Sequence, residues 1–98
     1  MNYQLIIRPE AAQEIQESFD WFEERSEGLG LEFVRSADAS LTAIERNPLA
    51  FPVVHKSIRR SLLKKFPYAF FYVIRENRIL VLACIHARRD PITWMNRD

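Results

Sequence analysis

Two neighbouring stretches decide the fold of this chain: YAFFYVI at residues 68–74 and ILVLACI at residues 79–85. Both are rich in aromatic and β-branched side chains, and the short polar break Glu76-Asn77 between them predicts a β-hairpin. Each stretch is apolar at odd and even positions alike, so both faces of the hairpin must be covered. The hairpin is therefore predicted to occupy the centre of a sheet.

The residues before the hairpin have helical periodicity. Apolar side chains recur at helical spacing over residues 12–22 and again over residues 33–44. Pro9 suits the first turn of a helix, and the only two glycines place a turn around residues 26–30. Asn47-Pro48 ends the second helix, because proline disfavours helical geometry in the residue before it. The pair is predicted to form an αα-hairpin.

Three further segments complete the expected topology. Residues 3–8 alternate as a short first strand, residues 49–57 are interpreted as a loop, and residues 58–65 are expected to form a strand before the hairpin. The predicted class is α+β with the order β-α-α-β-β-β, in which the helical hairpin packs on a small, mainly antiparallel, curved sheet. No linker or repeat indicates a second domain, so residues 1–98 are expected to form one domain.

Two helices can cover only one face of such a sheet. The other face must be closed by the carboxyl tail, by strong curvature or by another chain, and in the last case Phe71 and Val73 are candidate partner contacts. The intrachain alternative has Trp94 and Ile92 folding back onto the sheet. Trp21 lies outside the apolar stripe of its helix, so it is either a partner contact or packed at the helix edge.

The net charge of +1 hides a strong division along the chain. Residues 1–50 contain four basic and ten acidic groups, which gives 4 − 10 = −6, and residues 51–98 contain ten basic and three acidic groups, which gives 10 − 3 = +7. The asymmetry favours a polyanionic or acidic partner for the basic half, although neutralisation between packed layers is the alternative.

Several classes of protein are disfavoured. The single cysteine, Cys84, lies in an apolar run and is expected to be a buried hydrophobe, so no disulfide framework is expected. We find no leader and no segment of membrane-spanning length, which predicts a cytoplasmic protein without a membrane partner. No Gly-rich phosphate loop and no Cys/His zinc spacing occurs, so neither a cofactor nor a metal is expected.

The densest polar cluster is HARRDP at residues 86–91, directly after the last predicted strand. Histidine can transfer protons near neutral pH and arginine binds phosphate in a forked geometry, so this loop is a candidate phosphodiester or nucleic-acid site. The alternative is that Arg88 pairs with Asp90 or the acidic helices and that His86 only caps the sheet. Trp94 and Arg97 follow shortly after.

A second basic cluster lies on the preceding strand. Arg60 is expected to lie nearest to His86, whereas the side chain of Arg59 is expected on the opposite face of the same strand. Lys64 and Lys65 fall near the end of that strand, where they either assist the same site or are solvated charges that discourage edge-to-edge aggregation.

The order of these motifs resembles the RelE/ParE superfamily of toxins across nearly the whole chain. The resemblance rests on RPEA at residues 8–11, Asn47-Pro48, Arg60, FPYAFFY at residues 66–72 and HARRDP at residues 86–91. It implies the toxin of a bacterial type II toxin-antitoxin module. It also implies a cognate antitoxin that wraps the toxin, with Trp21, Phe71 and Val73 as candidate contacts.

Within that superfamily the resemblance leaves three alternatives. The HARRDP ending is more similar to ParE-like members, which block DNA gyrase. RelE-like members cut messenger RNA on the ribosome without metal; here His86 would be the acid or base, and Arg60 and Arg88 would hold the phosphate. The third alternative is a non-toxic relative that retains only antitoxin binding. The candidate target-binding residues are Arg60, Lys64, Lys65, His86, Arg88, Arg89, Trp94 and Arg97.

Overall fold

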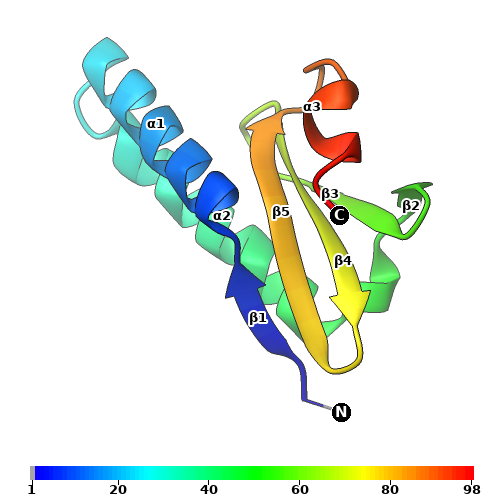
Figure 1. Cartoon of the computed structure of the whole chain (residues 1–98). Helices are drawn as coiled ribbons and strands as arrows, with labels where there is room; N and C mark the ends of the chain where they lie inside the picture. Colours follow the sequence, from blue (N-terminus) through cyan, green and yellow to red (C-terminus); the bar gives the residue numbers. More distant parts are fainter. Residues whose placement is uncertain (1) are drawn as a thin grey trace.

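A computed structural model describes residues 2–98 of the chain. Its helices and strands form a helical hairpin beside a five-stranded sheet whose strand order is β1-β5-β4-β3-β2 (Figure 1). β1 pairs with β5 in parallel, and the other neighbours are antiparallel. The elements are β1 (Gln4–Ile7), α1 (Pro9–Arg25), α2 (Leu29–Arg46), the 3₁₀ turn η1 (Pro48–Ala50), β2 (Val53–His55), β3 (Ile58–Leu62), β4 (Tyr68–Arg75), β5 (Arg78–His86) and α3 (Ile92–Met95).

The predicted α+β class and the helical hairpin are confirmed, and the central β4–β5 hairpin contains both predicted strand stretches. Three details differ. The segment expected to be a loop contains the short edge strand β2, so the sheet has five strands instead of four. β3 ends at Leu62 instead of Lys65, and the four-residue helix α3 was not predicted.

The two glycines of the hairpin turn have different roles. Gly28 has a φ of 87°, a left-handed conformation that glycine adopts without steric cost, and it directly precedes α2. Gly30 was expected in the turn but lies inside α2. A Cβ atom at Gly30 would come within 2.7 Å of the Phe19 carbonyl oxygen, so Gly30 allows α1 and α2 to pack closely.

The helix-facing side of the sheet is closed by a cluster of aromatic rings. The ring of Phe33, which is fully buried, stacks on Phe22 at 5.4 Å and meets Phe66 and Tyr68 edge-on. Tyr72 donates its hydroxyl hydrogen to the Pro48 carbonyl at 2.6 Å, which fixes the end of α2 over the sheet. Burial raises the pKa of this tyrosine to about 12. The helical layer is thus anchored at several points.

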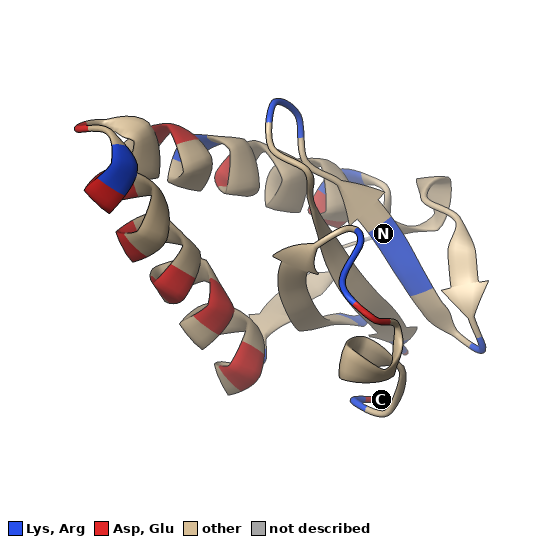
Figure 2. Cartoon of the chain, turned by 90° about the horizontal axis from the view of Figure 1, so that it is seen from above, with Lys and Arg blue, Asp and Glu red and all other residues tan. Residues whose placement is uncertain are grey.

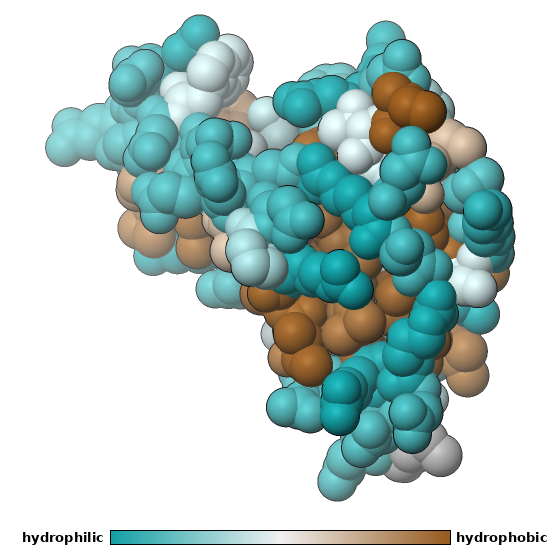
Figure 3. Space-filling model, in the orientation of Figure 1, coloured by the Kyte–Doolittle hydropathy of each residue, from teal (hydrophilic) through white to brown (hydrophobic). Residues whose placement is uncertain are grey.

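The opposite face of the sheet is closed by the carboxyl-terminal segment. Trp94 of α3 is 7% exposed and stacks on Phe71 with 4.2 Å between ring centroids. The intrachain closure is therefore confirmed for Trp94, but the part expected of Ile92 is wrong, because that side chain is 62% exposed. Figure 3 shows apolar surface over the strands below α3. The half-buried Ile6 and Leu80 pair across β1 and β5.

No helix between residues 2 and 98 combines the length and the apolar character needed to cross a membrane.

Candidate functional site

The loop after β5 holds its polar residues in a defined turn. The His86 carbonyl accepts the Arg89 N–H at 2.9 Å, and His86 Nδ1 accepts the Arg88 N–H at 3.0 Å. Because Nδ1 is an acceptor in this geometry, the neutral imidazole carries its proton on Nε2. The ring lies against Tyr68, with 5.7 Å between centroids. His86 therefore shapes the loop as well as ending the strand.

Arg88 and Arg89 are both exposed on this loop. Salt bridges within residues 2–98 involve only Arg75 and Arg97 among the basic groups, so the guanidinium groups of Arg88 and Arg89 have no acidic partner there. The alternative pairing of Arg88 with Asp90 is not formed, since an Asp90 oxygen instead accepts the Ile92 N–H at 3.1 Å. Both guanidinium groups are available to an external anion.

Arg97 has an internal partner. Its two terminal nitrogens donate to the two carboxylate oxygens of Glu14, each at 2.9 Å, and one of them also donates to the Leu82 carbonyl at 3.1 Å. The hydrogen bonds from Arg97 to Glu14 raise the pKa of the guanidinium. Arg97 was expected at a target-binding surface, but here it fastens the carboxyl terminus to α1.

Glu14 is also connected to the central strand. Its Oε1 atom accepts the Cys84 N–H at 3.0 Å. The Cys84 thiol is 1% exposed, as expected for a buried hydrophobe. Burial, together with the Glu14 carboxylate, raises the pKa of this thiol to about 12, so the group is inert as a nucleophile. One carboxylate on α1 therefore joins the helix, β5 and the terminal segment.

Arg60 does not lie beside His86, which corrects the sequence prediction. Arg60 pairs with Phe71, on the face covered by α3, whereas His86 pairs with Tyr68, on the helix-facing side. Directly opposed residues share a sheet face. Tyr68 and Phe71 are also three positions apart on β4, about 10 Å at 3.4 Å per residue. The sheet therefore lies between Arg60 and His86, which an acid-base mechanism would need beside each other.

Lys64 and Lys65 are exposed in the turn between β3 and β4. This turn lies beside the loop after β5, because the Ala87 N–H donates to the Pro67 carbonyl at 2.8 Å. Ser36 Oγ donates to the Lys64 carbonyl at 2.6 Å and so attaches the turn to α2. Figure 2 shows basic positions in both connections and acidic positions along α1. The end of the sheet is basic, whereas the neighbouring helix is acidic.

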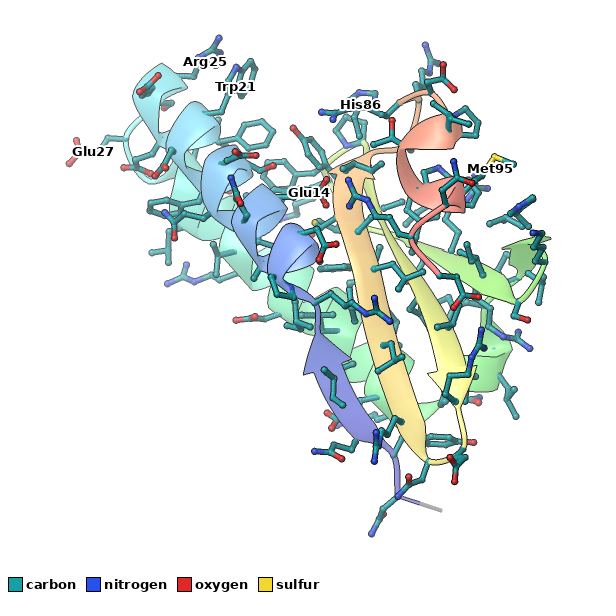
Figure 4. The ribbon with its side chains drawn as sticks, in the orientation of Figure 1. Glu14, Trp21, Arg25, Glu27, His86 and Met95 are labelled. Carbon is teal, nitrogen blue, oxygen red and sulfur yellow. The ribbon has the colours of Figure 1, made fainter. Side chains whose placement is uncertain are left out.

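Trp21 is 48% exposed, as expected for a residue at the helix edge. The Arg25 guanidinium carbon lies 3.5 Å from its ring centroid, and Figure 4 shows the two side chains together near the outer end of α1. Trp21 also lines a cleft of about 270 Å³ with Glu17, Tyr68 and Arg89. The structure thus brings together Trp21 and Arg89, which no sequence spacing connected.

Phe71 and Val73 were expected to contact a partner, but neither reaches the surface. They are 2% and 0% exposed beneath the carboxyl-terminal segment. A partner can touch these two side chains only if α3 moves. Accessible apolar side chains on this face include the half-buried Ile6 and Leu80 and the exposed Leu62.

A larger groove, of about 460 Å³, lies between α2 and the end of β3. It was not predicted, because the lining residues of α2 and those at the end of β3 are 18 or more residues apart in the sequence. The side chains that line it are mainly small or apolar, with charged residues at one end. The lining residues are Glu32, Arg35, Ser36, Ala39, Ser40, Ala43, Phe51, Ser61, Leu62, Lys64 and Lys65.

The described part of the chain, residues 2–98, contains no group of three or more His, Cys, Asp or Glu side chains that could hold a metal ion. The arginine, lysine and histidine side chains of the basic end supply hydrogen-bond donors and positive charge.

Together these elements define an α+β protein with a helical hairpin on a five-stranded mixed sheet. Among solved structures, the chain is similar to one described as "Chromosomal ParDE TA system from P. aeruginosa". The TM-score is 0.75 at 15% sequence identity, and the match covers 86% of this chain and 95% of that chain. No protein-family model and no curated protein sequence matches. The likeness shows the fold over nearly the whole length of both chains.

Proposed function

We propose that this chain is the toxin component of a bacterial type II toxin-antitoxin module and that it arrests growth by acting on DNA gyrase. The observation that carries the proposal is the fold likeness, over 86% of the chain, to a chain from a ParDE toxin-antitoxin system. The basic end of the sheet supports it, because Arg88 and Arg89 are exposed without acidic partners among residues 2–98.

The separation of Arg60 from His86 favours target binding over RNA cleavage. A metal-independent nuclease needs its acid, its base and its phosphate-binding arginine within reach of one phosphodiester. Here the Arg60 row and the His86 row lie on opposite faces of the sheet. A gyrase inhibitor needs only a complementary surface, which the loop at residues 86–91 and the turn at residues 63–67 supply together.

The partner in the proposal is a cognate antitoxin. Two accessible features support contact with another chain: the half-exposed Trp21 beside its cleft, and the apolar surface around Ile6 and Leu80. Large aromatic side chains and apolar patches are enriched where proteins bind each other.

The proposal is tested by inducible expression in bacteria, with and without the neighbouring open reading frame. We expect growth arrest without that frame and relief with it. The Arg88→Ala/Arg89→Ala double variant should lose the arrest. The matched control is Arg46→Ala/Arg78→Ala, which also removes two exposed, unbridged arginines but away from the basic end. Purified gyrase should lose supercoiling activity with the native chain and retain it with the Arg88/Arg89 variant.

The outcomes distinguish a gyrase inhibitor, a ribosome-dependent endonuclease and a non-toxic relative. Growth arrest with normal supercoiling and cleaved ribosome-bound messenger RNA would establish the endonuclease reading and overturn the gyrase target. Absence of arrest, with the antitoxin still bound, would identify a non-toxic relative.

A further inference from the structure

The cleft between α1 and the end of β5, of about 270 Å³, is lined by two opposite charges, hydroxyl groups and aromatic rings. We propose that this cleft binds a free α-amino acid with an apolar side chain. Arg89 holds the carboxylate of the ligand, and Glu17 holds its ammonium group. The inference concerns the purified chain and stands apart from its proposed toxicity.

Ser18 provides the first argument, because it is a buried serine without a partner inside the molecule. It lies on the core-facing side of α1, between Ile15 and Phe22, and only 9% of it is exposed. Ser61, the other buried polar residue of the described chain, bonds Ser40 at 3.2 Å, whereas the Ser18 hydroxyl has no hydrogen-bond partner among residues 2–98. Because no fully buried side-chain oxygen in this range lacks a partner, the Ser18 hydroxyl must reach the cleft.

The charges of the cleft provide the second argument. Arg89 and Glu17 both line it, and no salt bridge joins them. Glu14 lines it too, but its carboxylate is already held by both terminal nitrogens of Arg97. With that pair counted as neutral, the remaining charges give 1 − 1 = 0. Two opposite charges that do not neutralise each other suit a zwitterion, whose carboxylate can accept a forked pair of hydrogen bonds from arginine.

The backbone of β5 adds an acceptor for the ammonium group. Figure 4 shows Glu14 between α1 and β5, where it accepts the Cys84 N–H at 3.0 Å, so this N–H points away from β4. In an antiparallel pair the N–H and the C=O of one residue point to the same side. The Cys84 carbonyl therefore points toward α1, at the cleft that Cys84 lines. The Cys84 carbonyl, the Ser18 hydroxyl and the Glu17 carboxylate give an ammonium group three acceptors.

Trp21 and Tyr68 provide apolar surface for the side chain of the ligand. Trp21 is 48% exposed and lines the cleft. Arg25 covers one face of the indole but does not line the cleft, so the indole surface that faces the cleft is open. Aromatic rings of this kind pack well against apolar and aromatic groups. We therefore expect a ligand such as phenylalanine or leucine.

The size of the cleft favours a single amino acid over a larger ligand. The α1 residues that line it run from position 14 to position 21, which is about 10 Å at 1.5 Å per residue. Its volume of about 270 Å³ is below the roughly 300–1,000 Å³ of pockets for drug-sized ligands. An internal residue of a partner protein fits less well, because its backbone carries neither an ammonium group nor a carboxylate.

A phosphorylated ligand is disfavoured by the charge balance. A phosphate monoester carries about −1.5 to −2 charges near neutral pH. In this cleft it would meet one guanidinium, Arg89, together with the unneutralised carboxylate of Glu17. An amino acid matches both groups with one charge each.

The test is a ¹H–¹⁵N NMR titration of the full chain with L-phenylalanine and L-leucine. N-acetyl-L-phenylalanine lacks the ammonium group and L-phenylalaninamide lacks the carboxylate, while both keep the ring. We expect the amides of Ser18, Cys84 and Arg89 to shift, with a dissociation constant on the order of 1 mM or below for the zwitterion. Each blocked form should bind about tenfold more weakly.

Two charge-neutral variants assign the ends of the ligand. Glu17→Gln should weaken L-phenylalanine about tenfold and leave the affinity of the N-acetyl form unchanged, because that form has no ammonium group. Arg89→Gln should weaken L-phenylalanine about tenfold and leave the affinity of the amide form unchanged. Glu24→Gln and Arg78→Gln are the matched controls, since both residues are exposed and neither lines the cleft. They should change the affinity by about twofold or less. Circular dichroism confirms that each variant folds.

Ser18→Ala distinguishes a ligand-binding hydroxyl from a structural one. We expect the affinity for L-phenylalanine to fall about threefold or more, because one hydrogen bond is lost. The melting temperature should stay unchanged or rise, since alanine has the highest helix propensity and the hydroxyl has no partner within residues 2–98. A lower melting temperature with unchanged affinity would show that the serine serves the fold, and it would overturn the proposal.

Three further outcomes would overturn the proposal. The first is that neither amino acid binds with a dissociation constant below about 20 mM. The second is that the blocked forms bind as tightly as L-phenylalanine. The third is that inorganic phosphate or adenosine monophosphate shifts the same amides at lower concentration than the amino acids do. None of these measurements depends on growth arrest, so failure of the toxin proposal leaves this one intact.

Discussion

The two faces of the sheet are closed by very different amounts of structure. On one face, two helices of 17 and 18 residues pack through a cluster of aromatic rings around Phe33. On the other face, a helix of four residues contributes one buried ring, Trp94, and is fastened by the Arg97–Glu14 ion pair. The difference indicates that the helix-facing side carries the stability, whereas the α3 side can open without unfolding the molecule.

Removing the central ring of the helix-facing side should have the largest effect. Phe33→Ala deletes a fully buried side chain that contacts three other aromatic rings, and the cavity should cost about 3–5 kcal/mol of unfolding free energy. Such a loss is a large fraction of the stability of a small domain. Chemical denaturation monitored by circular dichroism measures it. A loss below about 1 kcal/mol would contradict the assignment of stability to this face.

Trp94→Ala should have a smaller and more local effect on the opposite face. The substitution exposes Phe71 and Val73. Because a large apolar side chain is no longer buried, we expect the free energy of unfolding to fall by about 2–3 kcal/mol. We expect the backbone amides of residues 87–98 to exchange hydrogen quickly while those of β4 and β5 stay protected. Hydrogen exchange with mass spectrometry separates the two regions. Equal deprotection of all strands would mean that both faces unfold as one unit.

The sequence was sufficient for the elements with a long signal. The helices were predicted because several turns repeat the same apolar spacing, and the hairpin at residues 68–86 was predicted from two long apolar runs separated by a short polar break. β2 and α3 were missed because three or four residues carry no periodic signal. Proline within the segment before β3 also made a loop the natural interpretation.

The candidate site was harder to predict, because it depends on which face each strand residue occupies. The sequence alone allows Arg60 and His86 to share one site, but the register of two successive hairpins places them on opposite faces. The Glu14–Arg97 pair joins residues 83 positions apart, and no local pattern connects them. The sequence identifies the basic residues, but only the fold shows which of them lie close together.

The smallest expected effect comes from Glu14→Gln, which tests the fastening of α3 without creating a cavity. Glutamine keeps an oxygen for the Cys84 N–H but removes the charge and one of the two acceptors for Arg97. We expect a loss of about 1–2 kcal/mol, because Arg97 is partly buried and loses its ionic partner. Glu17→Gln is the matched control. The Glu17 carboxylate is exposed and, among residues 2–98, accepts a side-chain hydrogen bond only from Gln13. Its substitution should change the free energy of unfolding by less than about 0.5 kcal/mol.

A double-mutant cycle with Arg97→Met distinguishes this pair from a general effect of the substitutions. If Glu14 acts through Arg97, the double variant should lose less stability than the sum of the two single variants. Additive losses would show that the Arg97–Glu14 pair does not fasten the terminal segment, which would then be held by Trp94 and by the exposed Arg75–Asp98 ion pair. Because exposed ion pairs contribute little, the α3 side would then depend mainly on one ring, and its contrast with the helix-facing side would be greater.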